Sequence, residues 1–230
     1  NYLRCIKGVD ESVGRLMGPL EELNLDENTV VIYSSDQGFF LGEHDLMDKR
    51  WIYEESMRMP FIVHYPKAVK AGSTNDWLIN NTDFAPTILA LAGVTAPDQM
   101  QGSNFASALR GEPRPADWRT ATYYRYWMHM AHHYNPAHFG IRTNRYKLIF
   151  FYGTGYGSQL DPKHENTPPG WELYDLQQDP YEMNNIYNNP ENQNLIKELK
   201  YKLQKMRVEI EEDDSQYPEI QKIIEEHWND

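Results

Sequence analysis

The sequence contains one cysteine, no long apolar run and no excess of basic residues. Cys5 is the only cysteine, so a disulfide within the chain is impossible and cysteine usage does not indicate a compartment. No apolar stretch approaches the roughly 20 residues that a membrane-spanning helix needs. Acidic residues outnumber basic ones by 34 to 22, which argues against nucleic-acid binding because phosphate backbones require a basic surface.

The chain opens at Asn1 without an initiator methionine, in what reads as the middle of a helix. Apolar residues recur every three or four positions from Tyr2 to Leu23 and predict a helix with one buried face. Gly18 and Pro19 are expected to kink or restart that helix, because proline removes a hydrogen bond and crowds the preceding turn. We expect the chain to be part of a longer protein.

Strand and helix patterns alternate through the first half of the chain, which predicts an α/β layer with a parallel sheet. Expected strands cover Thr29–Ser34, Phe61–Tyr65 and Trp77–Asn80. The first is a continuous β-branched and aromatic run, typical of a strand buried on both faces. Thr82 or Asp83 is expected to cap a helix that continues to Ala92.

The composition changes at 113–118, which is rich in proline and charge and marks a candidate boundary. Beyond it, a tight turn at Asn144 predicts a hairpin, and a helix is expected after Pro190. The four expected strands are Thr120–Trp127, Phe139–Thr143, Tyr146–Tyr152 and Trp171–Leu176. We therefore predict two parts, an α/β portion at 1–117 and a small α+β subdomain at 118–230.

Two neighbouring oxygen donors, Asp36 and Gln37, follow the first predicted strand. Open α/β sheets bind ligands at the carboxyl ends of their strands, and oxygen donors favour Ca²⁺ or Mg²⁺. Lys49, thirteen residues beyond Asp36, could hold an anion in the same place. The alternatives are a plain turn at Asp36 and an exposed Lys49 paired with Asp48 or Glu54.

The joint pattern closely resembles the sulfatase family of the alkaline-phosphatase superfamily, and the resemblance covers nearly the whole chain. It rests most specifically on the block from Ser35 to Pro60. The segments that carry it are Ser35-Asp36-Gln37-Gly38, Leu41-Gly42-Glu43-His44, Asp48-Lys49-Arg50, Tyr53-Glu54-Glu55-Ser56, Arg58-Met59-Pro60, Thr82-Asp83-Phe84-Ala85-Pro86-Thr87, Gly140-Ile141-Arg142-Thr143, Tyr146-Lys147-Leu148 and Trp171-Glu172-Leu173-Tyr174-Asp175-Leu176.

The resemblance implies an α/β fold: part of an alkaline-phosphatase-like, mostly parallel sheet flanked by helices at 1–117, the C-terminal portion of the catalytic core. A smaller antiparallel sheet with a packed helix is implied beyond it. It implies one Ca²⁺ that holds the sulfate, with Asp36 and Gln37 as half of the metal site, and Lys49 as the residue that contacts the sulfate and the bridging oxygen. His44 would either line the pocket or brace the loop.

Sulfatases of this kind use a formylglycine made from a Cys/Ser-x-Pro-x-Arg motif, and no cysteine or serine here begins one. Cys5 is followed by Ile6, Lys7 and Gly8, so it cannot serve. By resemblance, the nucleophile and the rest of the metal site would lie in an N-terminal half. We predict that the isolated 230-residue chain has no hydrolase activity.

Aromatic and histidine residues are concentrated between Tyr123 and Phe139. Aromatic faces stack on sugars, so Arg125, His129, His132 and His133 are candidate substrate-binding residues. The alternative is that several are satisfied by hydrogen bonds within the small sheet, and a four-histidine metal site is a weaker option.

The resemblance is strongest to bacterial carbohydrate sulfatases that act on glycosaminoglycans or algal polysaccharides. It implies a sulfated saccharide as substrate and a periplasmic or extracellular location. Two rival hypotheses remain, a phosphonate or phosphodiester hydrolase of the same superfamily and a non-catalytic carbohydrate-binding fragment.

Overall fold

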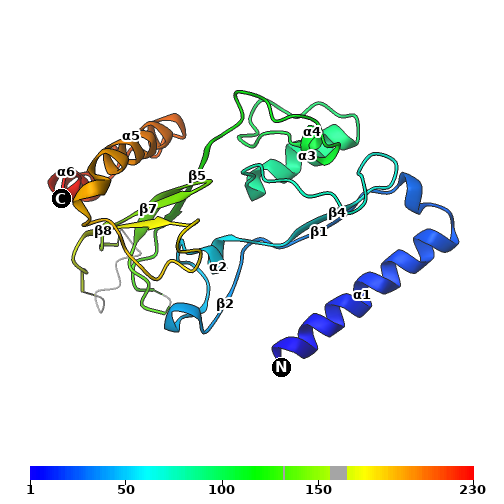
Figure 1. Ribbon diagram of the computed structural model, residues 1–230, viewed down its shortest axis with the longest axis horizontal. Coiled ribbons are helices and arrows are strands. Elements are labelled where there is room, and N and C mark those ends of the chain that lie inside the picture. Colours follow the sequence, from blue (N-terminus) through cyan, green and yellow to red (C-terminus); the bar gives the residue numbers. More distant parts are fainter. Residues whose placement is uncertain (132, 156–164) are drawn as a thin grey trace. The chain divides into compact units, whose positions relative to one another are not determined.

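The computed structural model describes residues 1–131, 133–155 and 165–230. Unit 1 comprises Asn1–Asp36 and Pro60–Trp118, and unit 2 comprises Gln37–Met59 and Arg119–Asp230. Figure 1 labels the main elements. Those of unit 1 are α1 (Tyr2–Glu22), η1 (Asp26–Asn28), β1 (Val31–Ser34), β4 (Phe61–His64), η3 (Asn81–Asp83), α3 (Phe84–Leu91) and α4 (Ala106–Leu109). Those of unit 2 are β2 (Phe40–Leu41), η2 (Glu43–Asp45), β3 (Met47–Asp48), α2 (Glu54–Met57), β5 (Ala121–Tyr126), β6 (His138–Thr143), β7 (Tyr146–Phe151), β8 (Gly170–Asp175), η5 (Pro190–Asn192), α5 (Gln193–Glu209) and α6 (Pro218–His227).

β1 and β4 of unit 1 form an antiparallel pair, which differs from the parallel pairing expected for these strands. The pair runs from Val31 opposite His64 to Ser34 opposite Phe61. The Ser34 hydroxyl donates to the Pro60 carbonyl at 2.9 Å. The chain thus leaves β1 after Ser34 and begins β4 beside that same end, so β4 runs antiparallel to β1. A parallel pair would require the connection to cross to the other end of β1.

Two other expectations for unit 1 change in the structure. Trp77–Asn80 is not part of a strand, because the Leu78 carbonyl accepts the indole N–H of Trp118 at 3.0 Å in place of a ladder bond. Helix α1 is continuous through Pro19, and none of its residues is buried by the described part of the chain. An apolar stripe indicates a face that favours burial and does not say what buries it. Among the helices that the structure describes, none has the length and apolar character needed to cross a bilayer.

Four strands of unit 2 form the predicted antiparallel sheet, in the order β5-β6-β7-β8. β6 and β7 are joined by the predicted hairpin, with Arg142 opposite Lys147. The Thr143 hydroxyl closes its turn by accepting the backbone N–H of Tyr146 at 2.8 Å. Helix α5 follows the turn at Pro190, also as predicted, whereas α6 has no counterpart among the predicted elements.

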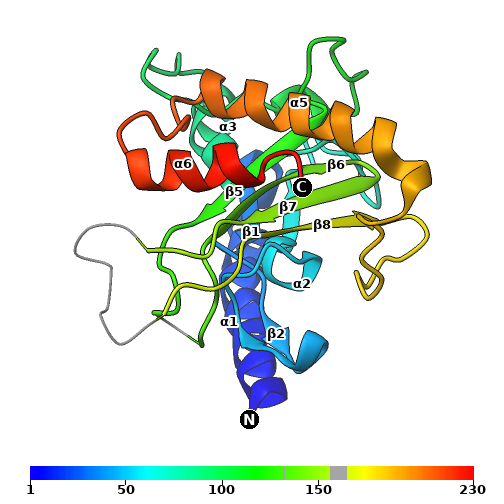
Figure 2. The same ribbon diagram turned by 90° about the vertical axis from the view of Figure 1, so that its left-hand side faces the viewer.

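The two faces of this sheet carry different partners, because successive side chains of a strand point to opposite sides. Helices α5 and α6 lie across one face (Figure 2) and bury a large apolar core there. That core includes Phe139, Ile141, Leu148, Phe150, Leu173, Ile196, Leu199, Leu203, Ile220 and Ile224. The residues between them in the strands, such as Ile149 and Phe151, pack with Phe40, Ile52 and Tyr53 on the other face.

The contacts place a boundary after Trp118, next to the expected one at residue 117. They group Gln37–Met59 with the C-terminal sheet, although the sequence-based division put these residues in the first part. The assignment of 1–117 to a catalytic core and of 118–230 to a subdomain stays a prediction.

We expect Leu203→Ala to destabilise unit 2 by about 2–5 kcal/mol, because it removes buried methyl groups and leaves a cavity. Leu203 lies on α5 and is 0% exposed. Urea unfolding followed by tryptophan fluorescence measures the effect. Tyr201→Ala on the exposed face of the same helix is the control, and an equal shift of both midpoints would contradict the packing described here.

Candidate functional site

The predicted site residues Gln37, His44 and Lys49 lie on one segment of unit 2, Gln37–Met59. This segment packs against the sheet face opposite α5 and α6. Strand alternation directs Tyr124, His138, Arg142, Lys147 and Glu172 toward that segment, and each of the five contacts a residue of it.

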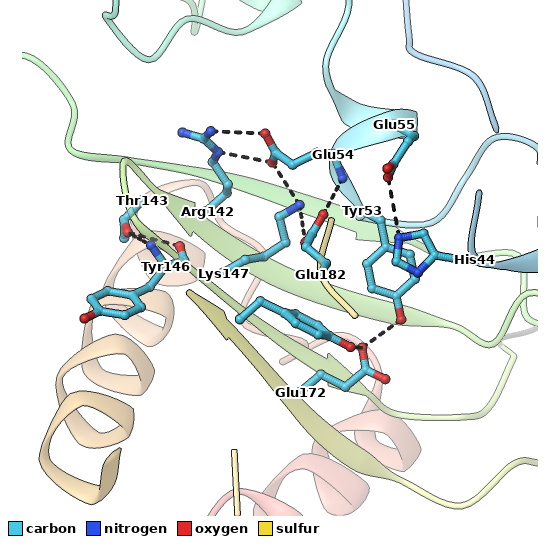
Figure 3. A network of polar contacts seen from close by, with 11 residues as sticks. His44, Tyr53, Glu54, Glu55, Arg142, Thr143, Tyr146, Lys147, Glu172 and Glu182 are labelled. Carbon is cyan, nitrogen blue, oxygen red and sulfur yellow. Dashed lines mark hydrogen bonds and ion pairs between the residues drawn. The ribbon is translucent and has the colours of Figure 1, made fainter. Parts of the chain in front are cut away.

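A buried charge cluster joins helix α2 to the sheet (Figure 3). The ammonium of Lys147, whose side chain is 0% exposed, lies 2.9 Å from Glu54 and 2.7 Å from Glu182. Arg142 donates two hydrogen bonds to the Glu54 carboxylate, at 3.1 and 3.2 Å. The second oxygen of Glu182 accepts the backbone N–H of Glu54 at 2.7 Å, which satisfies a donor at the start of α2.

The two carboxylates of this cluster differ in pKa because their surroundings differ. Burial favours the neutral form of Glu54, but Lys147 and Arg142 outweigh it and lower the pKa of Glu54 to about 2. Burial raises the pKa of Glu182, and Lys147 offsets this only in part. Glu182 has one cationic partner and a fully buried side chain, whereas Glu54 has two cationic partners.

A second contact between the segment and the sheet runs through Tyr53. Its hydroxyl donates to Glu172 of β8 at 2.8 Å, and Tyr174 donates to the same carboxylate at 3.1 Å. The His44 ring stacks on Tyr53, with centroids 4.5 Å apart, and its Nε2 lies 3.6 Å from the Glu55 carboxylate (Figure 3). These contacts brace the loop, which is one of the two roles expected for His44, and its predicted role in substrate binding stays a prediction.

Lys49 lies in a turn whose backbone is held by side chains from the sheet and the following loop. Its carbonyl accepts a hydrogen bond from the Asn135 side chain at 3.2 Å, and the Arg50 carbonyl accepts one from the Tyr124 hydroxyl at 2.8 Å. The Lys49 ammonium is 3.9 Å from a carboxylate oxygen of Asp48, and its side chain is 35% exposed. The pairing with Asp48 is one of the alternatives stated for this lysine, Asp48 pairs with Arg50 as well, and the predicted contact of Lys49 with sulfate stays a prediction.

Gln37 is tied to the same turn through Ser56. The Gln37 amide nitrogen donates to the Ser56 hydroxyl at 3.3 Å, and that hydroxyl also accepts the backbone N–H of Arg50 at 3.0 Å. Beside it, Gly38 donates its N–H to the Ser56 carbonyl at 2.7 Å. A Cβ at Gly38 would lie 2.1 Å from the Glu55 carbonyl oxygen, so only glycine fits this approach.

The donor chemistry at Gln37 fits a hard cation. Because its amide nitrogen is turned toward Ser56, the oxygen end of the amide points away from that contact, as a ligand to Ca²⁺ requires. Asp36 is the last residue of the first stretch of unit 1, so its place in the same metal site stays a prediction. In the described part of the chain, no three His, Cys, Asp or Glu side chains are grouped to hold a metal.

The candidate substrate-binding residues differ in their surroundings. Arg125 points to the α5 and α6 face, where it is 2% exposed, lies 2.7 Å from Asp214 and stacks on Trp127. The structure therefore does not bring Arg125 together with Lys49. The buried His129 ring accepts the Ala137 N–H at 3.1 Å and lies 3.2 Å from the Glu165 carbonyl, which matches the structural alternative stated for these histidines.

His133 is the candidate that the structure brings to the Lys49 turn. Its Nε2 lies 3.3 Å from Asp48, and its side chain is 53% exposed. His132 lies outside the described residues. The predicted roles of these histidines in binding a saccharide stay predictions.

Several residues that shape the site were missed by sequence reasoning. Lys147 had a detectable signal, because a charged residue inside the apolar run Tyr146–Tyr152 is almost never buried without partners. Tyr124 and Asn135 gave no such signal, since polar aromatics and asparagine are common in strands and loops. His138 was also missed, and burial lowers its pKa to about 4, so it is neutral under the Trp51 ring.

A family model described as N-sulphoglucosamine sulphohydrolase, C-terminal, matches residues 42–209. The chain belongs to this sulfatase family. It is 45% identical over 215 residues to an N-acetylglucosamine-6-O-sulfatase of Bacteroides thetaiotaomicron, a match that covers 93% of this chain and 36% of that protein. It is 30% identical over 212 residues to a Ulvan-active sulfatase of Formosa agariphila, covering 91% of this chain and 38% of that protein.

A solved sulfatase structure has the same fold as this chain. It is described as a complex with its substrate D-glucosamine-2-N,6-O-disulfate, and it matches with a TM-score of 0.82 and 45% identity over 91% of this chain and 40% of that chain. The alkaline-phosphatase-like fold class predicted from the sequence is therefore confirmed. The sulfatase chain described here spans 36% to 38% of the length of these two curated relatives.

We expect Lys147→Met to destabilise unit 2 by about 3–5 kcal/mol at neutral pH, because the buried Glu182 and the partly buried Glu54 lose their common cation. Glu182 already has a raised pKa and would bind a proton more readily in the folded variant than in the unfolded chain. The difference in unfolding free energy between the variant and the wild type should therefore shrink as the pH falls from about 7 to about 5, and grow as the pH rises. Urea midpoints measured across that range test this, with the exposed Lys205→Met as control. A deficit independent of pH would contradict the account of the cluster.

Proposed function

We propose that the protein containing this chain hydrolyses sulfate esters on a saccharide that contains glucosamine. The observation that carries the proposal is the 45% identity over 215 residues to an N-acetylglucosamine-6-O-sulfatase. The half-exposed Lys49 ammonium, 3.9 Å from the nearest carboxylate described for it, supplies a fitting group for the sulfate. Glycosaminoglycans are the substrate class that we infer, and the periplasm or the exterior of the cell is the proposed location.

Lys49 would donate a hydrogen bond to the bridging oxygen of the ester and stabilise the charge that develops there as the bond to sulfur breaks. Gln37 would bind Ca²⁺ through its amide oxygen, with Asp36 as the predicted second ligand from this chain. The bound Ca²⁺ would hold the sulfate oxygens, and a formylglycine in an N-terminal part of the protein would supply the nucleophile. His133, which is exposed beside Asp48, would contact the saccharide.

The full-length protein can be tested on glucosamine 6-O-sulfate, its N-acetyl form, glucosamine N-sulfate and matched phosphate and phosphonate esters. We expect sulfate release, measured by ion chromatography, with the 6-O-sulfates as the best substrates. A preference for the phosphonate ester would favour the rival hydrolase. No turnover of any ester by a protein that carries the Cys/Ser-x-Pro-x-Arg motif would overturn the proposal.

In that protein, Lys49→Ala should lower kcat by about 10² to 10³, because one charge-stabilising donor of the transition state is lost. Folding should be unchanged, since no side-chain contact of Lys49 closer than 3.9 Å is described. Steady-state kinetics with a melting curve measures both effects. Lys205→Ala is the matched control, and a similar kcat for both variants would contradict the role of Lys49.

The isolated chain of 230 residues should release no sulfate from any of these esters. It contains no Cys/Ser-x-Pro-x-Arg motif, so the proposed nucleophile is not part of it. Incubation at high protein concentration, with the full-length protein as a positive control, gives the measurement. Turnover by the isolated chain would contradict the proposed division of the active site.

A further inference from the structure

The turn that presents Lys49 has an unfavourable backbone conformation on both sides of the lysine. Asp48 has φ of 75° and Arg50 has φ of 95°, in the left-handed region that residues other than glycine rarely adopt. A residue in this conformation persists only where the surrounding contacts hold it there. The turn therefore requires contacts that hold it in place.

Three side chains supply those contacts. Tyr124 on β5 donates to the Arg50 carbonyl at 2.8 Å, and Asn135 donates to the Lys49 carbonyl at 3.2 Å. Ser56 on α2 accepts the Arg50 N–H at 3.0 Å. Both polar groups of the Lys49–Arg50 peptide and the next carbonyl, that of Arg50, are thus bound by side chains from three different segments of the chain.

Two of these side chains also bind Gln37. Its amide nitrogen donates to Ser56 at 3.3 Å, and its side chain hydrogen-bonds the hydroxyl of Tyr124. Ser56 is 0% exposed, so solvent does not compete for its hydroxyl. The same two hydroxyls therefore set the orientation of Gln37 and the conformation of the Lys49 turn.

We propose that Ser56, Tyr124 and Asn135 are positioning residues for sulfate ester hydrolysis, which couple the metal-binding amide of Gln37 to the ammonium of Lys49. The proposal rests on the function proposed above. The three residues touch neither the ester nor the metal. They act by fixing one turn, so their loss lowers the rate through Lys49 and weakens metal binding through Gln37.

Tyr124→Phe tests the proposal with the smallest change, because it deletes one hydroxyl. In the full-length protein, kcat on glucosamine 6-O-sulfate should fall about tenfold, because the turn that orients the Lys49 ammonium loses one of its hydrogen bonds. The control is Tyr126→Phe, two residues along the same strand and on the same face. The Tyr126 hydroxyl has no hydrogen-bond partner among the described residues, so this variant should match the wild type.

A double-mutant cycle with Lys49→Ala separates positioning from a general effect on structure. In the Lys49→Ala background at saturating Ca²⁺, Tyr124→Phe should have almost no further effect on kcat, because there is no ammonium left to position and the metal site is filled. A tenfold loss in both backgrounds would overturn the proposal, and so would equal rates for Tyr124→Phe and Tyr126→Phe. If the wild-type protein releases no sulfate, the proposed function fails instead, which keeps the two failures distinct.

Ser56→Ala gives a second test that does not depend on turnover. The midpoint of the Ca²⁺-dependent rise in melting temperature should move to higher Ca²⁺ concentration, because the Gln37 amide loses its fixed orientation. Ser56→Thr keeps a hydroxyl and should lie closer to the wild type. An unchanged Ca²⁺ midpoint in Ser56→Ala would overturn the coupling to Gln37, even where Tyr124→Phe does not yield folded protein.

Discussion

The ammonium of Lys147 lies between the carboxylates of Glu54 and Glu182 with no access to solvent, and the site depends on this arrangement. Removing an ammonium from water costs several kcal/mol, which only close and well-directed carboxylates can offset. One of those carboxylates comes from α2, more than ninety positions before the lysine in the sequence. The ion pair between Lys147 and Glu54 therefore also fixes α2, and the turn before it, on the sheet.

The second organising feature is the difference between the two faces of the sheet. One face is covered by α5 and α6, which bury a large apolar core there together with the ion pair between Arg125 and Asp214. The other face carries the polar side chains that hold the Lys49 turn. The packing of α5 and α6 supports one face of the sheet, while polar groups on the other face hold a strained turn in place. Sites that require exact orientation are generally supported in this way.

Much of this architecture was predictable because its signals are local. The strands β5 to β8, the hairpin after Thr143 and helix α5 each follow from a pattern within a few neighbouring residues. The antiparallel pairing of β1 with β4 was not predictable, because it depends on where the chain returns after residues 37–59. Arg125 shows the same limit, since only the register of β5 directs it to Asp214 while its neighbour Tyr124 meets Arg50.

The family and two candidate site residues, Gln37 for a metal ion and Lys49 for the sulfate, could be predicted from residue types in a short block. Only the folded structure shows which polar residues form hydrogen bonds and ion pairs with that block. His133 lies beside Asp48 while His129 is held by Ala137, and Ser56 binds both Gln37 and Arg50. The physical reason is that a hydrogen-bond partner is chosen by distance in space, and a buried polar group takes whichever partner the packing of distant segments brings to it.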